Sequence, residues 1–161
     1  MHVRLETTTA VLIAVAFGAC SNDVCGPSSA VVERVIDGDT IVLASGEKVR
    51  YLLIDAPETT NGHADCFGSN ATTFNRDLVL GKTVDLSYDN QCTDTYGRLL
   101  AYVSVDGTDV NALMVERGAA CVLFIPPDGE TRRSEFQTKQ ADAKARRAGL
   151  WGACDPLPPA C

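Results

Sequence analysis

The sequence has few of the residues on which several common kinds of functional site depend. It contains two histidines, His2 and His63, so acid–base chemistry that relies on a histidine pair lacks its parts. No CxxC pair occurs among the seven cysteines, which argues against a structural zinc site. The sequence also has no internal repeat and no low-complexity segment, and this excludes a repeat architecture.

An excess of positive charge is missing as well. The formal net charge is −7, whereas proteins that hold nucleic acid through many phosphate contacts are usually basic overall. Residues 130–148 are an exception, with six Lys or Arg and three acidic residues. A polynucleotide would therefore have to be held locally and with the help of a metal ion.

No apolar run near the N-terminus is long enough to span a bilayer, because the run at residues 10–17 is too short. It has the features of a signal-peptide core, so we expect residues 1–19 to be a signal peptide and the protein to be exported. The residues that end in Cys20 resemble the lipobox of bacterial lipoproteins, which predicts a lipidated Cys20 as a membrane anchor and a linker over residues 20–30. Cleavage after Gly18 and simple secretion is the alternative.

The remaining chain has the size and composition of one domain, with five short β-rich runs. Tight turns at Asp37-Gly38 and Ser45-Gly46 separate the first three runs, and Asp106-Gly107 follows the fifth. The alternation of apolar residues predicts strands over residues 31–36, 40–44, 48–54, 84–88 and 99–105, with a short extra strand over 122–125.

Helical patterns lie between and after these runs. Apolar residues at Ala71, Phe74, Leu78 and Leu80 predict a helix over residues 69–80. Two more helices are expected, one from the N-cap Asp109 to residue 117 and a charged one over 130–148. Five strands with a helix after the third predict an α+β fold, a five-stranded OB-like β-barrel with about three helices.

Acidic residues and arginines concentrate in three segments, which are IDGDT at 36–40, RYLLIDAPE at 50–58 and DTYGR at 94–98. In this order and at these spacings they resemble the staphylococcal-nuclease (thermonuclease) family. The likeness covers about residues 31–151, which we expect to form the nuclease domain, and leaves residues 152–161 as a Cys- and Pro-rich tail.

The resemblance implies a Ca²⁺-dependent enzyme that hydrolyses phosphodiester bonds of DNA or RNA at the P–O5′ bond. It implies that Asp39, Asp55 and the carbonyl of Ala56 bind Ca²⁺, that Glu58 is the general base, and that Arg50 and Arg98 hold the scissile phosphate. The chemistry is consistent, because Ca²⁺ takes six to eight oxygens and this ligand set leaves positions for water and phosphate. The arginine fork also matches phosphate. No obligate protein partner is inferred.

Four more residues are candidates for supporting roles. We interpret Asp37 first as a turn former and then as a support for the metal ligands, and Thr40 as a strand hydroxyl near a metal-bound water. Tyr96 fits either packing or ligand contact. Phe124 lies where better-known members of the family carry a nucleotide-binding tyrosine, and it can still stack on a base.

One spacing is difficult for this interpretation. Arg50 and Asp55 are five residues apart, so a straight strand would place them on opposite faces and roughly 17 Å apart. A coiled barrel strand that bends before Pro57 would bring them together.

Two other functions are compatible with parts of the pattern. Each acidic or arginine segment alone is also typical of an ordinary turn or a solvated surface. The main alternative is a catalytically inactive OB-fold lipoprotein that only binds nucleic acid. The second is a surface lipoprotein with a structural role, which would have little reason to keep two arginines opposite two carboxylates and a glutamate.

Six cysteines remain when Cys20 is set aside, and an even number in an exported protein indicates disulfide bonds. A bridge from Cys66 to Cys92 would join the loop after Glu58 to the loop before Arg98. The expected pairing is therefore Cys66 with Cys92, Cys121 with Cys154, and Cys25 with Cys161.

The lipid anchor gives a direct test. We expect the substitution Cys20→Ser to move the protein from the membrane fraction to the soluble fraction, because it removes the acylated side chain. The measurement is cell fractionation of both variants. An unchanged distribution would favour simple secretion or an uncleaved N-terminal anchor.

Overall fold

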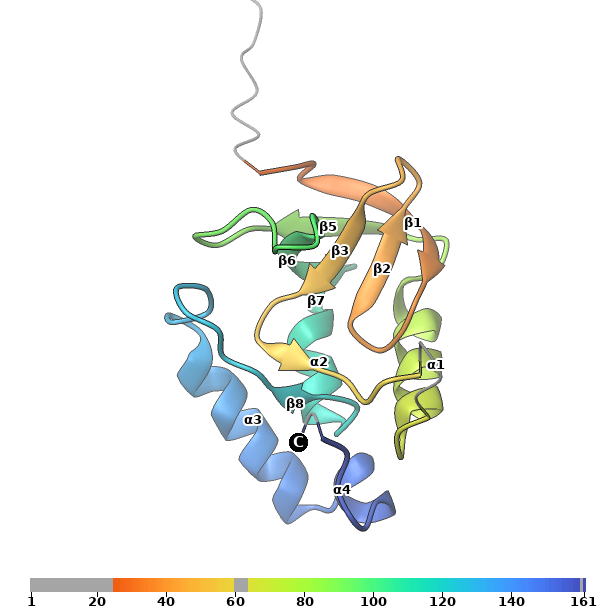
Figure 1. The fold of residues 1–161 in the computed structure, drawn as a ribbon, viewed down its shortest axis with the longest axis vertical. Helices are drawn as coiled ribbons and strands as arrows, with labels where there is room; N and C mark the ends of the chain where they lie inside the picture. Colours follow the sequence, from red (N-terminus) through yellow and green to blue (C-terminus); the bar gives the residue numbers. More distant parts are fainter. Residues whose placement is uncertain (1–24, 60–63, 160) are drawn as a thin grey trace, which may run out of the picture.

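The structure, a computed structural model, describes residues 25–59, 64–159 and 161. The expected signal peptide, Cys20 and His63 lie outside these residues. A closed β-barrel forms one end of the molecule, and helices α2, α3 and α4 lie at the other end (Figure 1). Within the described part of the chain, no helix combines the length and apolarity that crossing a membrane requires.

Five strands close the barrel, as the sequence predicts. Strand β1 pairs antiparallel with β2 and β5, β2 pairs antiparallel with β3, and β5 pairs antiparallel with β6. A parallel pairing of β3 with β6 closes the ring. The bounds are Ser29–Val35 for β1, Thr40–Leu43 for β2, Lys48–Tyr51 for β3, Thr83–Ser87 for β5 and Leu99–Val105 for β6.

The predicted third strand is interrupted. It ends at Tyr51, and residues Ile54–Asp55 form a separate strand, β4, that pairs with β8 (Cys121–Val122) outside the barrel. The predicted extra strand over 122–125 is therefore shorter and begins one residue earlier. This break directs the chain away from the barrel just before Asp55.

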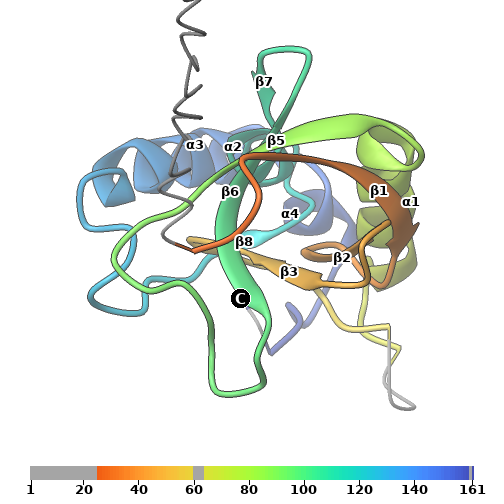
Figure 2. The same cartoon turned by 90° about the horizontal axis from the view of Figure 1, so that it is seen from above.

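Three helices agree with the predicted number and order, and they are α1 (Gly68–Val79), α2 (Val110–Glu116) and α3 (Arg133–Ala145). A single helical turn that was not predicted, α4 (Leu150–Ala153), follows α3, and β7 (Thr108–Asp109) precedes α2. The Asp109 carboxylate accepts a hydrogen bond of 2.8 Å from Ala112 N, which confirms the N-cap. Helices α1 and α3 lie on opposite sides of the molecule (Figure 2).

Helix α1 buries a different face from the one expected. Its buried residues include Ala71, Thr72, Asn75 and Val79, whereas Phe74 and Leu78 are only partly buried and Leu80 is 43% exposed. Hydrophobicity alone missed the two polar residues on this face, because each makes a hydrogen bond that compensates for its burial.

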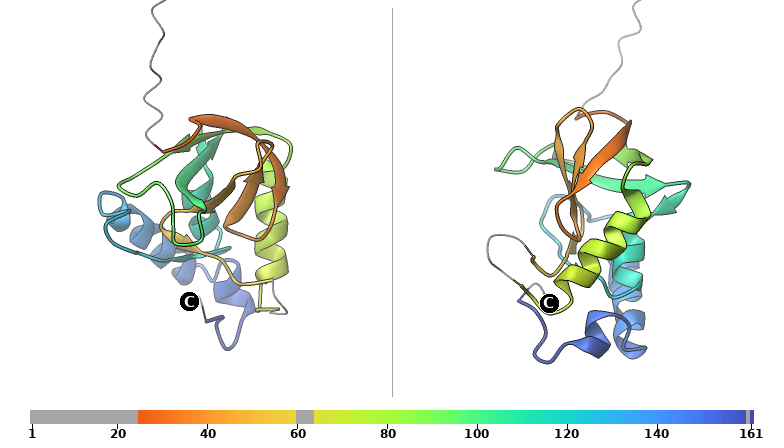
Figure 3. Two further views of the ribbon diagram at one scale, coloured as in Figure 1. Left: turned by 45° about the horizontal axis from the view of Figure 1, so that its top comes forward. Right: turned by 90° about the vertical axis from the view of Figure 1, so that its right-hand side faces the viewer.

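All six cysteines form disulfides, but the predicted pairing is wrong. The bonds are Cys25–Cys92, Cys66–Cys154 and Cys121–Cys161. Their Cα atoms lie 4.7, 5.8 and 5.6 Å apart, which a disulfide requires. The physical reason is tertiary. Helix α4 and the C-terminal residues return beneath the barrel (Figure 3), so two partners come from the end of the chain.

Loss of the Cys66–Cys154 bond should lower stability strongly. This bond closes a loop with a sequence separation of 88 residues. On the chain-entropy model, replacing both cysteines with serine lowers the free energy of unfolding by about 4 kcal/mol. Guanidinium unfolding of both proteins measures this effect, and an unchanged midpoint would contradict the pairing.

Candidate functional site

The guanidinium of Arg50 joins the first two acidic segments. Its Nε lies 3.2 Å from Asp39 Oδ1, and its Nη2 donates a hydrogen bond of 2.6 Å to Asp55 Oδ1. Its Nη1 donates to the backbone carbonyls of Tyr51 (2.9 Å) and Ile54 (2.7 Å). Only 12% of the side chain is exposed, so one charged group fixes both carboxylates in a mostly dry environment.

A sharp bend resolves the spacing problem between Arg50 and Asp55. Leu53 lies between β3 and β4 with φ at +64°, a left-handed conformation that is rare for leucine. Its buried side chain packs directly on Gly129, where a β-carbon would overlap it. The sequence gives no signal for this bend, because its residues read as a continuous apolar strand.

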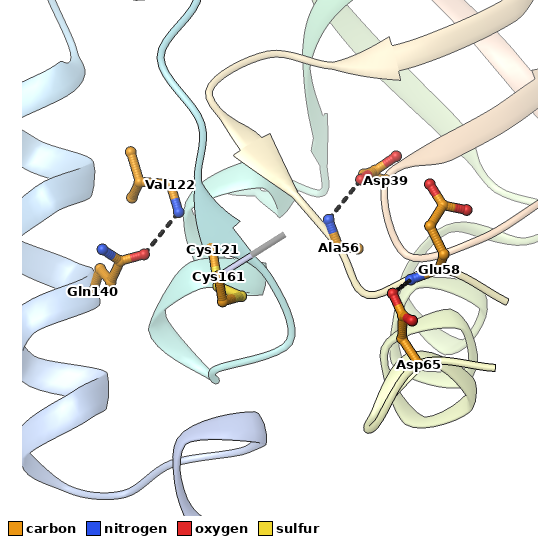
Figure 4. The surroundings of a disulfide bond; sticks show 8 residues. All are labelled: Asp39, Ala56, Glu58, Asp65, Cys121, Val122, Gln140 and Cys161. Atoms are coloured by element: carbon orange, nitrogen blue, oxygen red, sulfur yellow. Dashed lines mark hydrogen bonds between the residues drawn. A yellow bond between two sulfur atoms is a disulfide. The ribbon is translucent and has the colours of Figure 1, made fainter. Parts of the chain in front are cut away.

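Asp39 is almost fully buried, and both of its carboxylate oxygens are engaged. Oδ1 accepts a hydrogen bond of 3.0 Å from Thr40 Oγ1 in addition to the contact with Arg50. Oδ2 accepts a hydrogen bond of 2.7 Å from Ala56 N, shown in Figure 4. Three predicted site residues, Asp39, Thr40 and Ala56, are thus in direct contact.

Asp37 stabilises the turn that carries Asp39, which agrees with a role as a turn former. Its Oδ1 accepts a hydrogen bond of 3.0 Å from Asp39 N, and its carbonyl accepts one of 3.0 Å from Asn75 Nδ2. Tyr51 Oη completes the chain by donating to Asn75 Oδ1 at 2.9 Å. Sequence reasoning missed Asn75. The only indication in the sequence was its place in α1, next to the apolar Phe74 and one helical turn after Ala71.

Negative charge exceeds positive charge in this region. Burial, together with repulsion from Asp39, raises the pKa of Asp37 to about 7. Burial also raises the pKa of Asp55 to about 6. Arg50 opposes that shift, while Asp39 and Glu58 add to it. A cation bound here would therefore offset unfavourable repulsion.

Glu58 follows this cluster on the chain and is exposed. Figure 4 shows its side chain extending from the loop after Pro57 toward the turn that carries Asp39. The contribution of Glu58 to the pKa values of Asp37 and Asp55 agrees with this placement. The structure therefore gathers four carboxylates in one region, and two of them, Asp39 and Asp55, contact Arg50 directly.

Arg98 comes from the third segment and is held in a different way. Its Nε donates a hydrogen bond of 2.7 Å to Asp94 Oδ2, and its guanidinium lies 5.6 Å from the centre of the Tyr96 ring. Partial burial raises the pKa of Asp94, but the hydrogen bonds from Arg98 outweigh this effect, and the pKa lies below its usual value. In the part of the chain that the structure describes, the terminal Nη atoms of Arg98 have no hydrogen-bond partner. Sequence reasoning did not single out Asp94.

Arg50 and Arg98 line one cavity of about 560 Å³. Tyr96, 84% exposed, stands at its edge, and Leu123 and Ile125 contribute aliphatic surface. Phe124 is not among the lining residues. It packs against the hydrophobic core, and the guanidinium of Arg133 covers its ring at 4.4 Å. The stacking role expected for Phe124 stays a prediction.

The residues around Arg50 fit a hard divalent cation. Their donors are carboxylate and carbonyl oxygens, which Ca²⁺ prefers, and the repulsion among the acids favours such an ion. Among the described residues, no group of three His, Cys, Asp or Glu side chains is arranged as a ready-made metal site. Two carboxylates and the Ala56 carbonyl would thus form an open site that water and a ligand complete.

The fold and this site define a small OB-like barrel protein in which a cluster of carboxylates lies beside a cavity lined by two arginines. Residues 48–153 match the family described as Staphylococcal nuclease homologue. The chain is 34% identical over 140 residues to a thermonuclease of Staphylococcus intermedius, covering 84% of this chain and 82% of that protein. The chain therefore belongs to the staphylococcal-nuclease family.

Two relatives from Bacillus subtilis (strain 168) are longer than this chain. Endonuclease YncB is 37% identical over 126 residues, and SPbeta prophage-derived endonuclease YokF is 36% identical over 126 residues. Each alignment covers 74% of this chain. The chain spans 60% of YncB and 43% of YokF.

The bend at Leu53 can be tested through Gly129. We expect Gly129→Ala to lower the free energy of unfolding by about 1–3 kcal/mol beyond the strain of its positive φ, because the new methyl group overlaps Leu53. Gly107→Ala is the matched control, since Gly107 has a similar φ of +76° with open space around it. Equal losses in guanidinium unfolding would show that the contact with Leu53 is unimportant.

Proposed function

We propose that this protein is a nuclease that hydrolyses phosphodiester bonds of DNA or RNA with Ca²⁺ as its cofactor. The observation that carries the proposal is the pair of guanidinium groups, Arg50 and Arg98, on one cavity beside Asp39 and Asp55. Family membership and relatives named endonuclease and thermonuclease support the same reaction.

Each residue has a specific part in this reaction. Arg98 is oriented through Nε by Asp94, so its terminal nitrogens can hold two oxygens of the scissile phosphate. Arg50 contacts the phosphate from the acidic side. Glu58 takes a proton from the attacking water as the water oxygen bonds to phosphorus. The bond from phosphorus to the 5′ oxygen breaks, and the released 5′ oxygen takes a proton from solvent.

Asp39, Asp55 and the Ala56 carbonyl would hold Ca²⁺. When bound, the ion supplies positive charge that stabilises the charge developing on the phosphate oxygens. Thr40 and Ala56 N keep the Asp39 carboxylate in one orientation through its two oxygens. Arg50 does the same for Asp55.

The substrate is held at one place on an acidic molecule. With a net charge of −7, the protein lacks a general attraction for polyanions. The arginine pair supplies a local one, and Tyr96 with Leu123 and Ile125 offers a surface for a base. We propose that the protein acts outside the cytoplasm, with Cys20 as its lipid anchor.

The substitution Glu58→Gln tests the proposal most directly. Glutamine keeps the shape of the side chain but cannot accept the proton, so we expect kcat to fall by about 10²- to 10⁴-fold. The Kd for a nucleotide inhibitor should change little, because Glu58 is assigned neither to the metal nor to the phosphate. The exposed Glu47→Gln is the matched control and should keep the parental kcat.

Both measurements are made with Ca²⁺ and with excess EGTA. A Glu58→Gln kcat within about threefold of the parent would refute the general base. Full activity in EGTA would refute the role of Ca²⁺. If the parent binds oligonucleotide without cleaving it, the protein is the inactive binding module instead.

A further inference from the structure

The backbone of Glu58 is clamped by a residue that the proposed reaction leaves unused. Asp65 Oδ2 accepts a hydrogen bond of 3.1 Å from Glu58 N, and Asp65 N donates one of 3.0 Å to Glu58 O (Figure 4 shows the first). The peptide groups on both sides of Glu58 are therefore fixed by one residue, seven positions further along the chain. The two hydrogen bonds restrict the position of the Glu58 Cα atom, from which the side chain extends.

The start of α1 presses on the same backbone. A β-carbon on Gly68 would lie 2.7 Å from Glu58 O and 3.1 Å from Pro57 O, so this close approach requires glycine. Gly68 N in turn donates a hydrogen bond of 3.0 Å to Asp65 O. Residues Asp65 to Gly68 thus form one tight turn, and the backbone of Glu58 is hydrogen-bonded to the first residue of that turn.

A covalent bond fixes this turn to the rest of the molecule. Cys66 lies between Asp65 and Gly68, and its disulfide with Cys154 ties the turn to the end of α4. Asp65 is consequently anchored through the disulfide of the adjacent Cys66 and through the hydrogen bond that its carbonyl accepts from Gly68 N, the first residue of α1. A half-buried loop residue without such anchors would not be expected to hold a neighbour in one place.

We propose that Asp65 is a positioning residue for Glu58. It fixes the Glu58 backbone so that the carboxylate reaches the water that attacks the phosphate. The proposal rests on the proposed role of Glu58 as general base. A general base must lie within hydrogen-bond distance of the proton it takes, and a misplacement of about 1 Å can cost on the order of 10²-fold in rate.

The test begins with two substitutions at one position. Asp65→Ala removes the side-chain acceptor, and we expect kcat to fall by about 10-fold or more while KM changes little. Asp65→Asn keeps an oxygen that can accept from Glu58 N, so it should restore most of the parental kcat. Equal losses in both variants would overturn the proposal.

A double-mutant cycle separates positioning from general stability. On a Glu58→Gln background the loss caused by Asp65→Ala should disappear, because there is no longer a base to position. A loss that stays the same would show that Asp65 acts independently of Glu58 and would overturn the proposal. A Glu58→Gln variant with the parental kcat would instead refute the proposed general base.

Gly68→Ala provides a second variant that displaces the same backbone by a different contact. It leaves the Asp65 carboxylate in place, so it remains informative if Asp65→Ala fails to fold. We expect it to lower kcat and to leave KM nearly unchanged, and its effect should also vanish on the Glu58→Gln background. A kcat equal to that of the parent would overturn the proposal.

Discussion

The contacts of Arg50 are the constraint on which the site depends. One guanidinium reaches Asp39 from the β1–β2 turn, Asp55 from β4 and two backbone carbonyls on its own segment. Removing Arg50 would leave the Asp39 and Asp55 carboxylates partly buried without a neutralising charge, and this would lower the free energy of unfolding. The Arg50 guanidinium, together with the hydrogen bond from Ala56 N to Asp39, therefore holds β4 against the turn that carries Asp39.

The two arginines have contrasting surroundings, and the contrast has a functional meaning. The Arg50 side chain donates hydrogen bonds to two backbone carbonyls and to Asp55, whereas among the described residues the Arg98 side chain donates only from Nε, to Asp94. Arg50 therefore organises the acidic residues, and in the proposed reaction Arg98 is the group that receives the phosphate.

The disulfides each reinforce a segment that carries site residues. Cys92 precedes the Asp94–Arg98 loop, Cys66 lies in the turn under Glu58, and Cys121 pairs in register with Asp55. Their partners come from the start and the end of the described chain. Because loops are the most mobile parts of a fold, these bonds restrict motion where geometry matters most for the chemistry.

The sequence by itself determined the barrel strands, the number of helices and the acidic and arginine residues of the site, because hydrophobic periodicity, caps and motif spacing are local properties. Tertiary structure alone decided the bend at Leu53, the contact of Gly129 with it, the burial of Asn75 and the disulfide partners. It also packed Phe124 against the hydrophobic core, with the Arg133 guanidinium over its ring. Each of these depends on which distant segments meet, and no local pattern records that.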